Sequence, residues 1–164
     1  MNRNTFAFIF SVLAITLLYY SCKKEKNATI APLLASGSWQ LASAQVTSYT
    51  GDTQDSLVKL DSGCVFKQIF TFKADNTCTF TNYHCQESTT TGNWSLSNDR
   101  LFLISDIAFQ DTTVIGKARV FENSRIVNLG QYSLVLEVGD IQTNYGSRQK
   151  RRIARYGFIR QKTQ

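Results

Sequence analysis

The chain has 164 residues, of which 43% are hydrophobic and 18% charged, and its formal net charge is +6. This length is typical of a single domain with one core. Residues 37–147 carry seven basic and eleven acidic side chains, whereas residues 148–164 carry seven basic and no acidic ones. The charge distribution therefore excludes a uniformly basic protein, because the domain body is mildly acidic and only its last strand and tail are basic.

The N-terminal residues are expected to direct the chain to a membrane. Asn2–Asn4 is polar and basic, and the apolar run Phe6–Tyr20 has 15 residues, which is short for a membrane span but typical of a signal-peptide core. The run ends in Leu18-Tyr19-Tyr20-Ser21-Cys22, which resembles the lipobox of bacterial lipoproteins. The resemblance implies cleavage before Cys22 and a diacylglycerol on its sulfur. A plain secretory signal or an uncleaved anchor is the alternative.

The same resemblance implies a location in the cell envelope. Lys after Cys22, where Asp would retain the protein in the inner membrane, is typical of outer-membrane lipoproteins of Gram-negative bacteria. Lys23–Lys26 lacks the acidic run that sends some of them to the cell surface, so we expect the chain to face the periplasm. The expected organisation is a signal peptide at 1–21, a lipidated tether at 22–36 and a folded domain at 37–164. Membrane lipid, reached through acylated Cys22, is the first expected partner.

The segment from Phe66 to Thr81 predicts a tight β-hairpin. It is rich in aromatic and β-branched residues, and Ala74-Asp75-Asn76 supplies a turn. If Lys73 pairs with Thr77, the alternation of side chains places a set of apolar residues on one face of the hairpin and threonines on the other. The apolar set consists of Phe70, Phe72, Cys78 and Phe80.

The cysteines support an oxidising compartment. The hairpin register brings Cys64 and Cys85 together at its open end, so we predict a disulfide between them that closes a loop of about 20 residues and contributes ~3 kcal/mol. With Cys22 lipidated, three cysteines remain, so the alternatives are one disulfide and one free thiol, or no disulfide. Cys78 points into the core and is expected to be the free thiol.

The rest of the domain predicts further short strands. Thr50–Ser62 is expected to be a loop because it is rich in Gly, Asp, Ser and Thr. The fold class is therefore all-β, an antiparallel up-and-down barrel of eight to ten strands preceded by an N-terminal signal helix. The remaining strands are expected at Gly37–Tyr49, Gly92–Leu96, Leu101–Ile104, Leu134–Val138 and Ile153–Arg160, and one or two more are expected from Val114-Ile115, Val120-Phe121 and Ile126-Val127.

These elements resemble the lipocalin-like lipoproteins of Gram-negative bacteria. The resemblance rests on Gly37-x-Trp39, the cysteine-bracketed hairpin, Gly92-x-Trp94-x-Leu96 and the paired strands near the end. It implies that Trp39 packs across the closed end of the barrel under an arginine, either Arg155 or Arg160. The residues expected to close the barrel are Gly37, Trp39, Gly92, Trp94 and Arg160. Fold alone does not define function, because such folds host many activities.

Two functions are compatible with this fold. In the first, a small apolar or amphiphilic ligand binds inside a cavity lined by Phe70, Phe72, Phe80, Phe102, Phe121 and Leu136. In the second, side chains fill the barrel and the protein is an envelope or protein-interaction module. It would then act through a basic surface that meets anionic lipid or glycan, formed by Arg148, Lys150, Arg151 and Arg152. An envelope location argues against nucleic acid as a partner.

Catalytic chemistry finds little support in the sequence. His84 is the only histidine and adjoins Cys85, but neighbours on a strand point to opposite faces, and the spacing offers no fourth metal ligand. No nucleophile elbow or glycine-rich phosphate loop is present. We expect a protein that is not an enzyme, with no metal or other cofactor.

Overall fold

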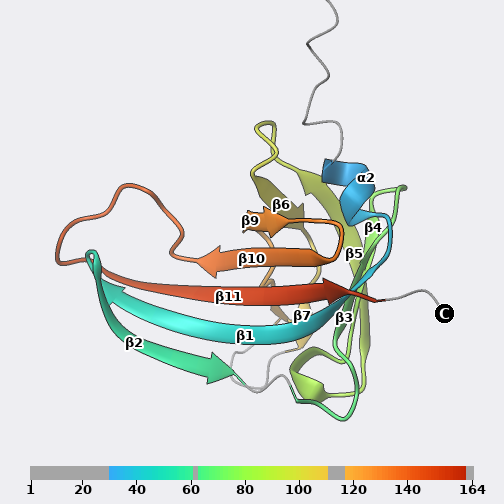
Figure 1. Ribbon diagram of the computed structural model, residues 1–164, viewed down its shortest axis with the longest axis horizontal. Helices are drawn as coiled ribbons and strands as arrows, with labels where there is room; N and C mark the ends of the chain where they lie inside the picture. The colour runs from blue at the N-terminus through green and yellow to red at the C-terminus, as the bar shows by residue number, and fades with distance from the viewer. Residues whose placement is uncertain (1–29, 61–62, 111–116, 162–164) are drawn as a thin grey trace, which may run out of the picture.

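The computed structural model describes residues 30–60, 63–110 and 117–161. The predicted signal peptide at 1–21 and the lipidation site Cys22 lie outside these residues. Within them, the fold is an all-β, closed antiparallel barrel of eight strands with a ninth strand outside the ring, as the sequence predicts (Figure 1). No helix in the described ranges is long and apolar enough to cross a membrane.

The strands follow one another around the ring in chain order, which confirms the up-and-down arrangement. Pairing of the last strand with the first closes the ring. The strands of the ring are β1 (Ser38–Thr50), β3 (Ile69–Phe72), β4 (Thr77–Thr81), β5 (Thr89–Leu96), β6 (Phe102–Ser105), β9 (Ser124–Leu129), β10 (Ser133–Gly139) and β11 (Lys150–Arg160).

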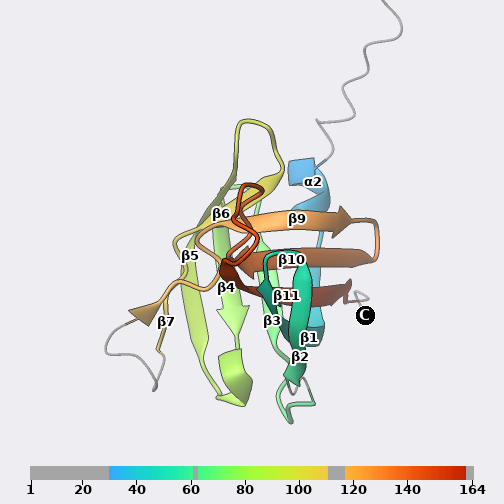
Figure 2. The ribbon, with the colours of Figure 1, turned by 90° about the vertical axis from the view of Figure 1, so that its left-hand side faces the viewer.

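The expectation of a loop over Thr50–Ser62 is wrong for most of its length. Only Gly51-Asp52 turns the chain, and β2 (Thr53–Leu60) then pairs with the second half of β1, from Ala44 to Thr50. β3 pairs with the beginning of the same edge of β1, so one long strand carries two partners in tandem. β2 and the adjoining halves of β1 and β11 extend away from the ring as a projecting sheet, to the left in Figure 1 and toward the viewer in Figure 2.

The central hairpin forms in the predicted register. The amide of Lys73 donates to the carbonyl of Thr77, Phe72 pairs with Cys78, and Phe70 pairs with Phe80. All four residues of the predicted apolar face are buried. The register is fixed because a slip by one residue would expose that entire face.

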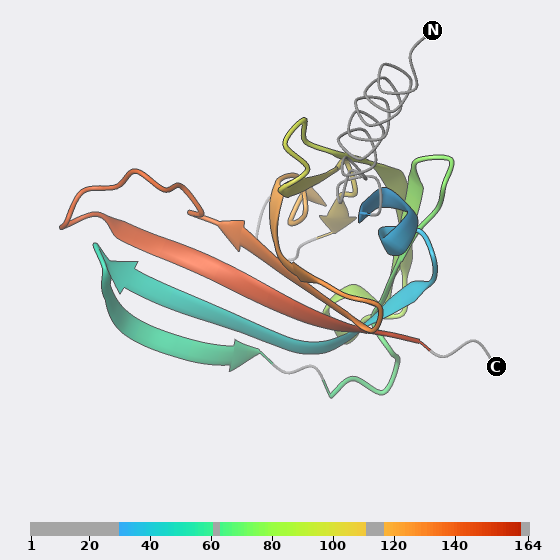
Figure 3. The same cartoon turned by 45° about the horizontal axis from the view of Figure 1, so that its top comes forward.

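A short helix covers one end of the barrel where the sequence predicts a tether. α2 (Ile30–Leu34) places Leu34 fully inside the core, and Figure 3 shows the helix lying over this end. The packed part of the chain therefore begins at least seven residues before Gly37. Five residues are too few to show helical periodicity, so this helix depends on its contacts with the barrel.

The segment between β6 and β9 also differs from the prediction. β7 (Phe109–Gln110) and β8 (Lys117–Ala118) form a small separate hairpin, and Val120-Phe121 lies in a turn rather than in a strand. The strand predicted at Val114-Ile115 lies outside the described residues.

Candidate functional site: barrel interior, barrel ends and the arginine pocket

Aromatic side chains fill the described interior of the barrel. Phe70 lies at the centre, with its ring centroid 4.2 Å from that of Phe72 and 5.2 Å from those of Phe80 and Phe121. Phe158 of β11 approaches the same ring at 6.3 Å. These spacings are those of directly contacting aromatic rings. The predicted cavity residues of this group therefore contact one another.

The six predicted cavity residues are not all in the interior. Phe70, Phe72, Phe80, Phe121 and Leu136 are fully buried. Phe102 is a correction: it is only partly buried, because the inward positions of β6 are Leu103 and Ser105. Alternation along the strand therefore turns Phe102 to the outer face of the barrel.

Phe121 reaches the interior from the turn after β8. Its ring centroid also lies 6.0 Å from that of Phe109 in β7 and 5.2 Å from that of Tyr156 in β11, so Phe121 contacts aromatic residues of both strands. Strand alternation does not predict this position, because the residue is not in a strand.

The closed end of the barrel is built around Trp39. Its indole nitrogen donates to the carbonyl of Leu34 at 2.9 Å, and the guanidinium of Arg160 lies 4.7 Å from the ring centroid. Arg160 also donates to the carbonyl of Leu33 at 2.8 Å. Of the two arginines considered from the sequence, it is Arg160 that covers the tryptophan, while Arg155 pairs with Glu137 on the outer face.

The second Gly-x-Trp motif performs a similar role on the central hairpin. The indole nitrogen of Trp94 donates to the carbonyl of Lys73 at 2.9 Å, and its ring meets Phe72 edge-on at 5.4 Å. Asp106 and Ile107 approach Gly92 closely, because a Cβ there would lie 2.4 Å from a carboxylate oxygen of Asp106 and 3.0 Å from the backbone nitrogen of Ile107. Both tryptophans therefore donate to backbone carbonyls, Trp39 to that of α2 and Trp94 to that of the central hairpin at its turn.

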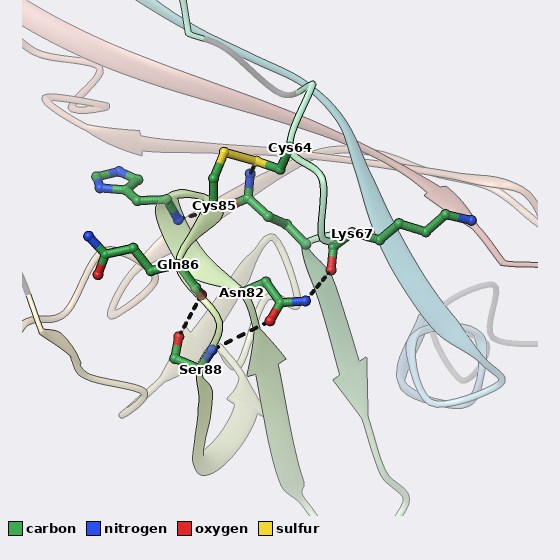
Figure 4. Close-up of a disulfide and its surroundings, with 8 residues drawn as sticks. Cys64, Lys67, Asn82, Cys85, Gln86 and Ser88 are labelled. Carbon is green, nitrogen blue, oxygen red and sulfur yellow. Dashed lines mark hydrogen bonds between the residues drawn. A yellow bond between two sulfur atoms is a disulfide. The ribbon is translucent and has the colours of Figure 1, made fainter.

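The predicted disulfide joins Cys64 and Cys85 (Figure 4). Beside it, the side chain of Asn82 donates to the carbonyl of Lys67 at 2.9 Å, which adds a second link between the two segments. Asn82, His84 and Cys85 all have positive φ values, between 52° and 63°. Non-glycine residues rarely adopt this conformation, so the crosslink holds a turn that is locally unfavourable.

Cys78 is a buried free thiol, as expected. It lies 3.5 Å from the hydroxyl of Ser105, and burial raises the pKa of Cys78 above its ordinary value. Burial likewise raises the pKa of Tyr156. A raised pKa keeps the thiol protonated and therefore inert as a nucleophile.

We expect Cys78 to resist maleimide at pH 8 in the native protein and to react when the protein is unfolded. Because the pKa of Cys78 is higher in the folded protein, the folded state keeps its thiol proton at a pH where the unfolded chain has lost it. The contribution of Cys78 to stability is therefore fully present below the unfolded pKa of about 9 and is lost as the pH rises through the folded pKa. Urea unfolding between pH 7 and pH 10.5 should show this alkaline loss, with a smaller loss in Cys78→Ala. Rapid labelling of the native protein would contradict the prediction.

His84 and Cys85, the adjacent pair considered for catalysis, both lie in the turn that carries the disulfide. The ring of His84 stacks on that of Tyr83, with their centroids 4.1 Å apart. Cys85 forms the disulfide with Cys64 and therefore has no free thiol. No group of three metal-ligating side chains occurs in residues 30–60, 63–110 and 117–161.

The predicted basic surface needs one correction. Arg148, Lys150 and Arg152 are exposed, but Arg151 is only 9% exposed. Its guanidinium carbon lies 3.4 Å from the ring centroid of Tyr145, and it donates to the carbonyl of Gly51 at 2.9 Å. Alternation along β11 turns Arg151 to the face opposite Lys150 and Arg152, where the loop at 140–149 covers it.

Arg151 lines a pocket of about 290 Å³ that the sequence analysis did not identify. We call it the arginine pocket, and it lies on the outer face of the sheet formed by β1, β9, β10 and β11. The residues that line it are Gln45, Thr47, Tyr49, Asp52, Arg125, Glu137, Tyr145, Arg151, Ile153 and Arg155. The available signal was the alternation of charged residues in the last three strands, but their register across the sheet was not known.

Comparison with protein families agrees with this architecture. The family model of the lipocalin-like domain matches residues 36–135, more than half of the chain. The chain therefore belongs to the lipocalin-like domain family. The match ends within β10, so β11, which closes the barrel, lies beyond the matched residues. No curated protein matches the chain.

Proposed function

We propose that this protein is a lipid-anchored lipoprotein of the outer membrane that faces the periplasm, and that its barrel is a non-enzymatic binding module. In this proposal the barrel is filled, and binding takes place on its outer surface. The central observation is the direct contact among Phe70, Phe80, Phe121 and Phe158. A small barrel has barely enough room for its own side chains, so these rings occupy the place of a ligand.

A second candidate function is the binding of a small apolar or amphiphilic ligand by the barrel itself. Membership of the lipocalin-like family is compatible with it. A pocket of about 430 Å³ lies beside the η2 turn (Tyr83–Cys85), where Tyr83 and Phe109 stack at 3.9 Å. A ligand held there would contact the edge of the aromatic core without displacing Phe70.

Native mass spectrometry of the full-length mature protein separates the two candidates. If the barrel is filled, the protein released from detergent should have the mass of the acylated chain alone, with no bound small molecule. Fatty acids, quinones and sterols should then not raise its melting temperature. A reproducible adduct of a few hundred daltons that is lost in organic solvent would favour the second candidate. The protein should first be purified from a Gram-negative host, so that natural ligands can bind.

Anchoring is tested separately through Cys22. We expect the wild-type chain to fractionate with membranes and to carry the mass of the acyl groups, because two chains hold a protein stably where one is marginal. Cys22→Ala should appear unlipidated, either as an unprocessed precursor or in the soluble fraction. Cys78→Ala is the matched control, since it removes a cysteine without affecting lipidation. An unlipidated wild-type chain would contradict the anchor and leave the binding proposal to be judged by mass spectrometry.

A further inference from the structure

The arginine pocket lies over a row of shorter side chains that runs between two rows of longer ones. Strand register places Gly139 of β10, Ile153 of β11 and Thr47 of β1 side by side in one row across the sheet. Gly139 has no side chain and a φ of +98°, and a Cβ there would lie 2.4 Å from the carbonyl oxygen of Arg152. The position therefore requires glycine, and the other two residues of this row, Thr47 and Ile153, line the pocket.

One wall is a charged row across three strands. Glu137 of β10 lies opposite Arg125 of β9 on one side and Arg155 of β11 on the other. Its carboxylate is 2.5 Å from a guanidinium nitrogen of Arg125 and 3.6 Å from one of Arg155. Glu137 is 12% exposed, whereas the arginines are 38% and 46% exposed. The carboxylate is thus already neutralised, and the guanidinium groups retain N–H donors that reach the solvent.

The opposite wall holds Arg151 in a fixed position. Its guanidinium lies between the rings of Tyr145 and Tyr49, 3.4 and 5.2 Å from their centroids. The Tyr145 hydroxyl donates to Asp52 at 2.6 Å, so this second carboxylate also has a partner. The Nε of Arg151 is buried and has no hydrogen-bond partner among the described residues. Such orphaned buried donors are uncommon and indicate either strain or a missing acceptor.

We propose that the arginine pocket binds the oxyanion group, carboxylate or phosphate, of a small polar molecule. Three guanidinium groups face two carboxylates that are both already engaged, so the pocket has an excess of positive charge and of free N–H donors. Arginine presents its donors in a planar fork that matches carboxylate and phosphate oxygens. Gln45 and Thr47 add neutral partners for hydroxyl groups, and the volume is at the lower end of the range for small-molecule sites.

The inference rests on the proposed function only in placing the binding site outside the barrel. It does not depend on the lipid anchor, and Arg152 provides an internal control. Arg152 neighbours Arg151 on β11 but is exposed on the opposite face of the sheet. Arg152→Gln therefore makes the same change in charge as Arg155→Gln without altering the pocket.

The test is a two-dimensional NMR titration of the full-length mature protein in neutral detergent micelles. Glucuronate, glucose 6-phosphate and glucose are the probes, because they share one sugar ring and differ in the presence and type of anion. We expect saturable shifts at Thr47, Gly139 and Arg155 with at least one of the two anions, and none with glucose. The anion that binds more tightly identifies the ligand as a carboxylate or a phosphate.

The variants decide whether the binding is specific. Arg155→Gln should weaken binding at least tenfold, whereas Arg152→Gln should change it less than twofold. Equal weakening in both variants would show a general response to net charge and would overturn the proposal, as would the absence of saturable shifts with either anion. Adducts in the native mass spectra of the barrel would not affect this result, so the failure of one proposal is distinguishable from the failure of the other.

Discussion

Replacing Phe70 with alanine is expected to lower the free energy of unfolding by about 3–5 kcal/mol. The side chain is fully buried, and its ring contacts those of Phe72, Phe80, Phe121 and Phe158. The loss combines the transfer of a large apolar group to water with the cavity left among rings that belong to four separate segments. Urea unfolding of Phe70→Ala, followed by tryptophan fluorescence, measures the change.

Phe66→Ala is the matched control for this prediction. Phe66 lies in the same part of the sequence but is 46% exposed, so its removal should change the stability by less than about 0.5 kcal/mol. A loss below about 1 kcal/mol for Phe70→Ala would mean that the interior has room to rearrange. That outcome would favour a hollow barrel and the second candidate function.

Removal of the disulfide is expected to cost about 3 kcal/mol. Cys64 and Cys85 are 21 residues apart in sequence, and their bond restricts the unfolded chain over that length. The double variant Cys64→Ser/Cys85→Ser should therefore unfold at a lower urea concentration. Hydrogen exchange should also rise first at residues 82–85, where the backbone is held in an unfavourable conformation.

Reduction provides the control for the disulfide prediction. Wild-type protein treated with a reductant should match the double variant, while Cys78→Ala should keep the bond and lose a similar amount of stability on reduction. A double variant as stable as the oxidised wild type would show that Asn82 and its bond to Lys67 are sufficient to hold the turn.

Local sequence was sufficient to predict the central hairpin in detail. A turn of Ala74-Asp75-Asn76 between two alternating segments leaves only one register that buries both Phe70 and Phe80. The position of Cys64 relative to Cys85 follows from that register, which explains why the disulfide prediction is confirmed.

The same reasoning failed where structure depends on distant contacts. Thr50–Ser62 has the composition of a loop, yet Thr53–Leu60 forms a strand because the long edge of β1 offers it backbone partners. Val120-Phe121 has the composition of a strand, yet it lies in a turn from which Phe121 enters the core. In both cases tertiary contacts outweighed the local β propensity.

The candidate sites were likewise predicted where they depend on local sequence and missed where they depend on distant contacts. Alternation in the central hairpin correctly placed Phe70, Phe72 and Phe80 in the core, whereas Phe102 was assigned to the wrong face. The arginine pocket was missed because it depends on the side-by-side placement of Asp52, Arg125, Glu137 and Arg155, which come from four separated segments. Arg151 was counted with the exposed basic residues because its cover, Tyr145, comes from a loop with no regular pattern.

The sequence alone therefore determined the all-β class, the order of most strands, the hairpin register and the disulfide, because each depends on side-chain alternation and turn residues within a few positions. The tertiary structure decided how the barrel end is closed, where Phe121 lies and which arginines meet. Leu34 is buried in the core, and Trp39 and Arg160 donate to carbonyls of the short α2 helix that carries it. Such contacts join residues up to 127 positions apart, and their geometry is set by barrel closure and strand register, which no local pattern in the chain encodes.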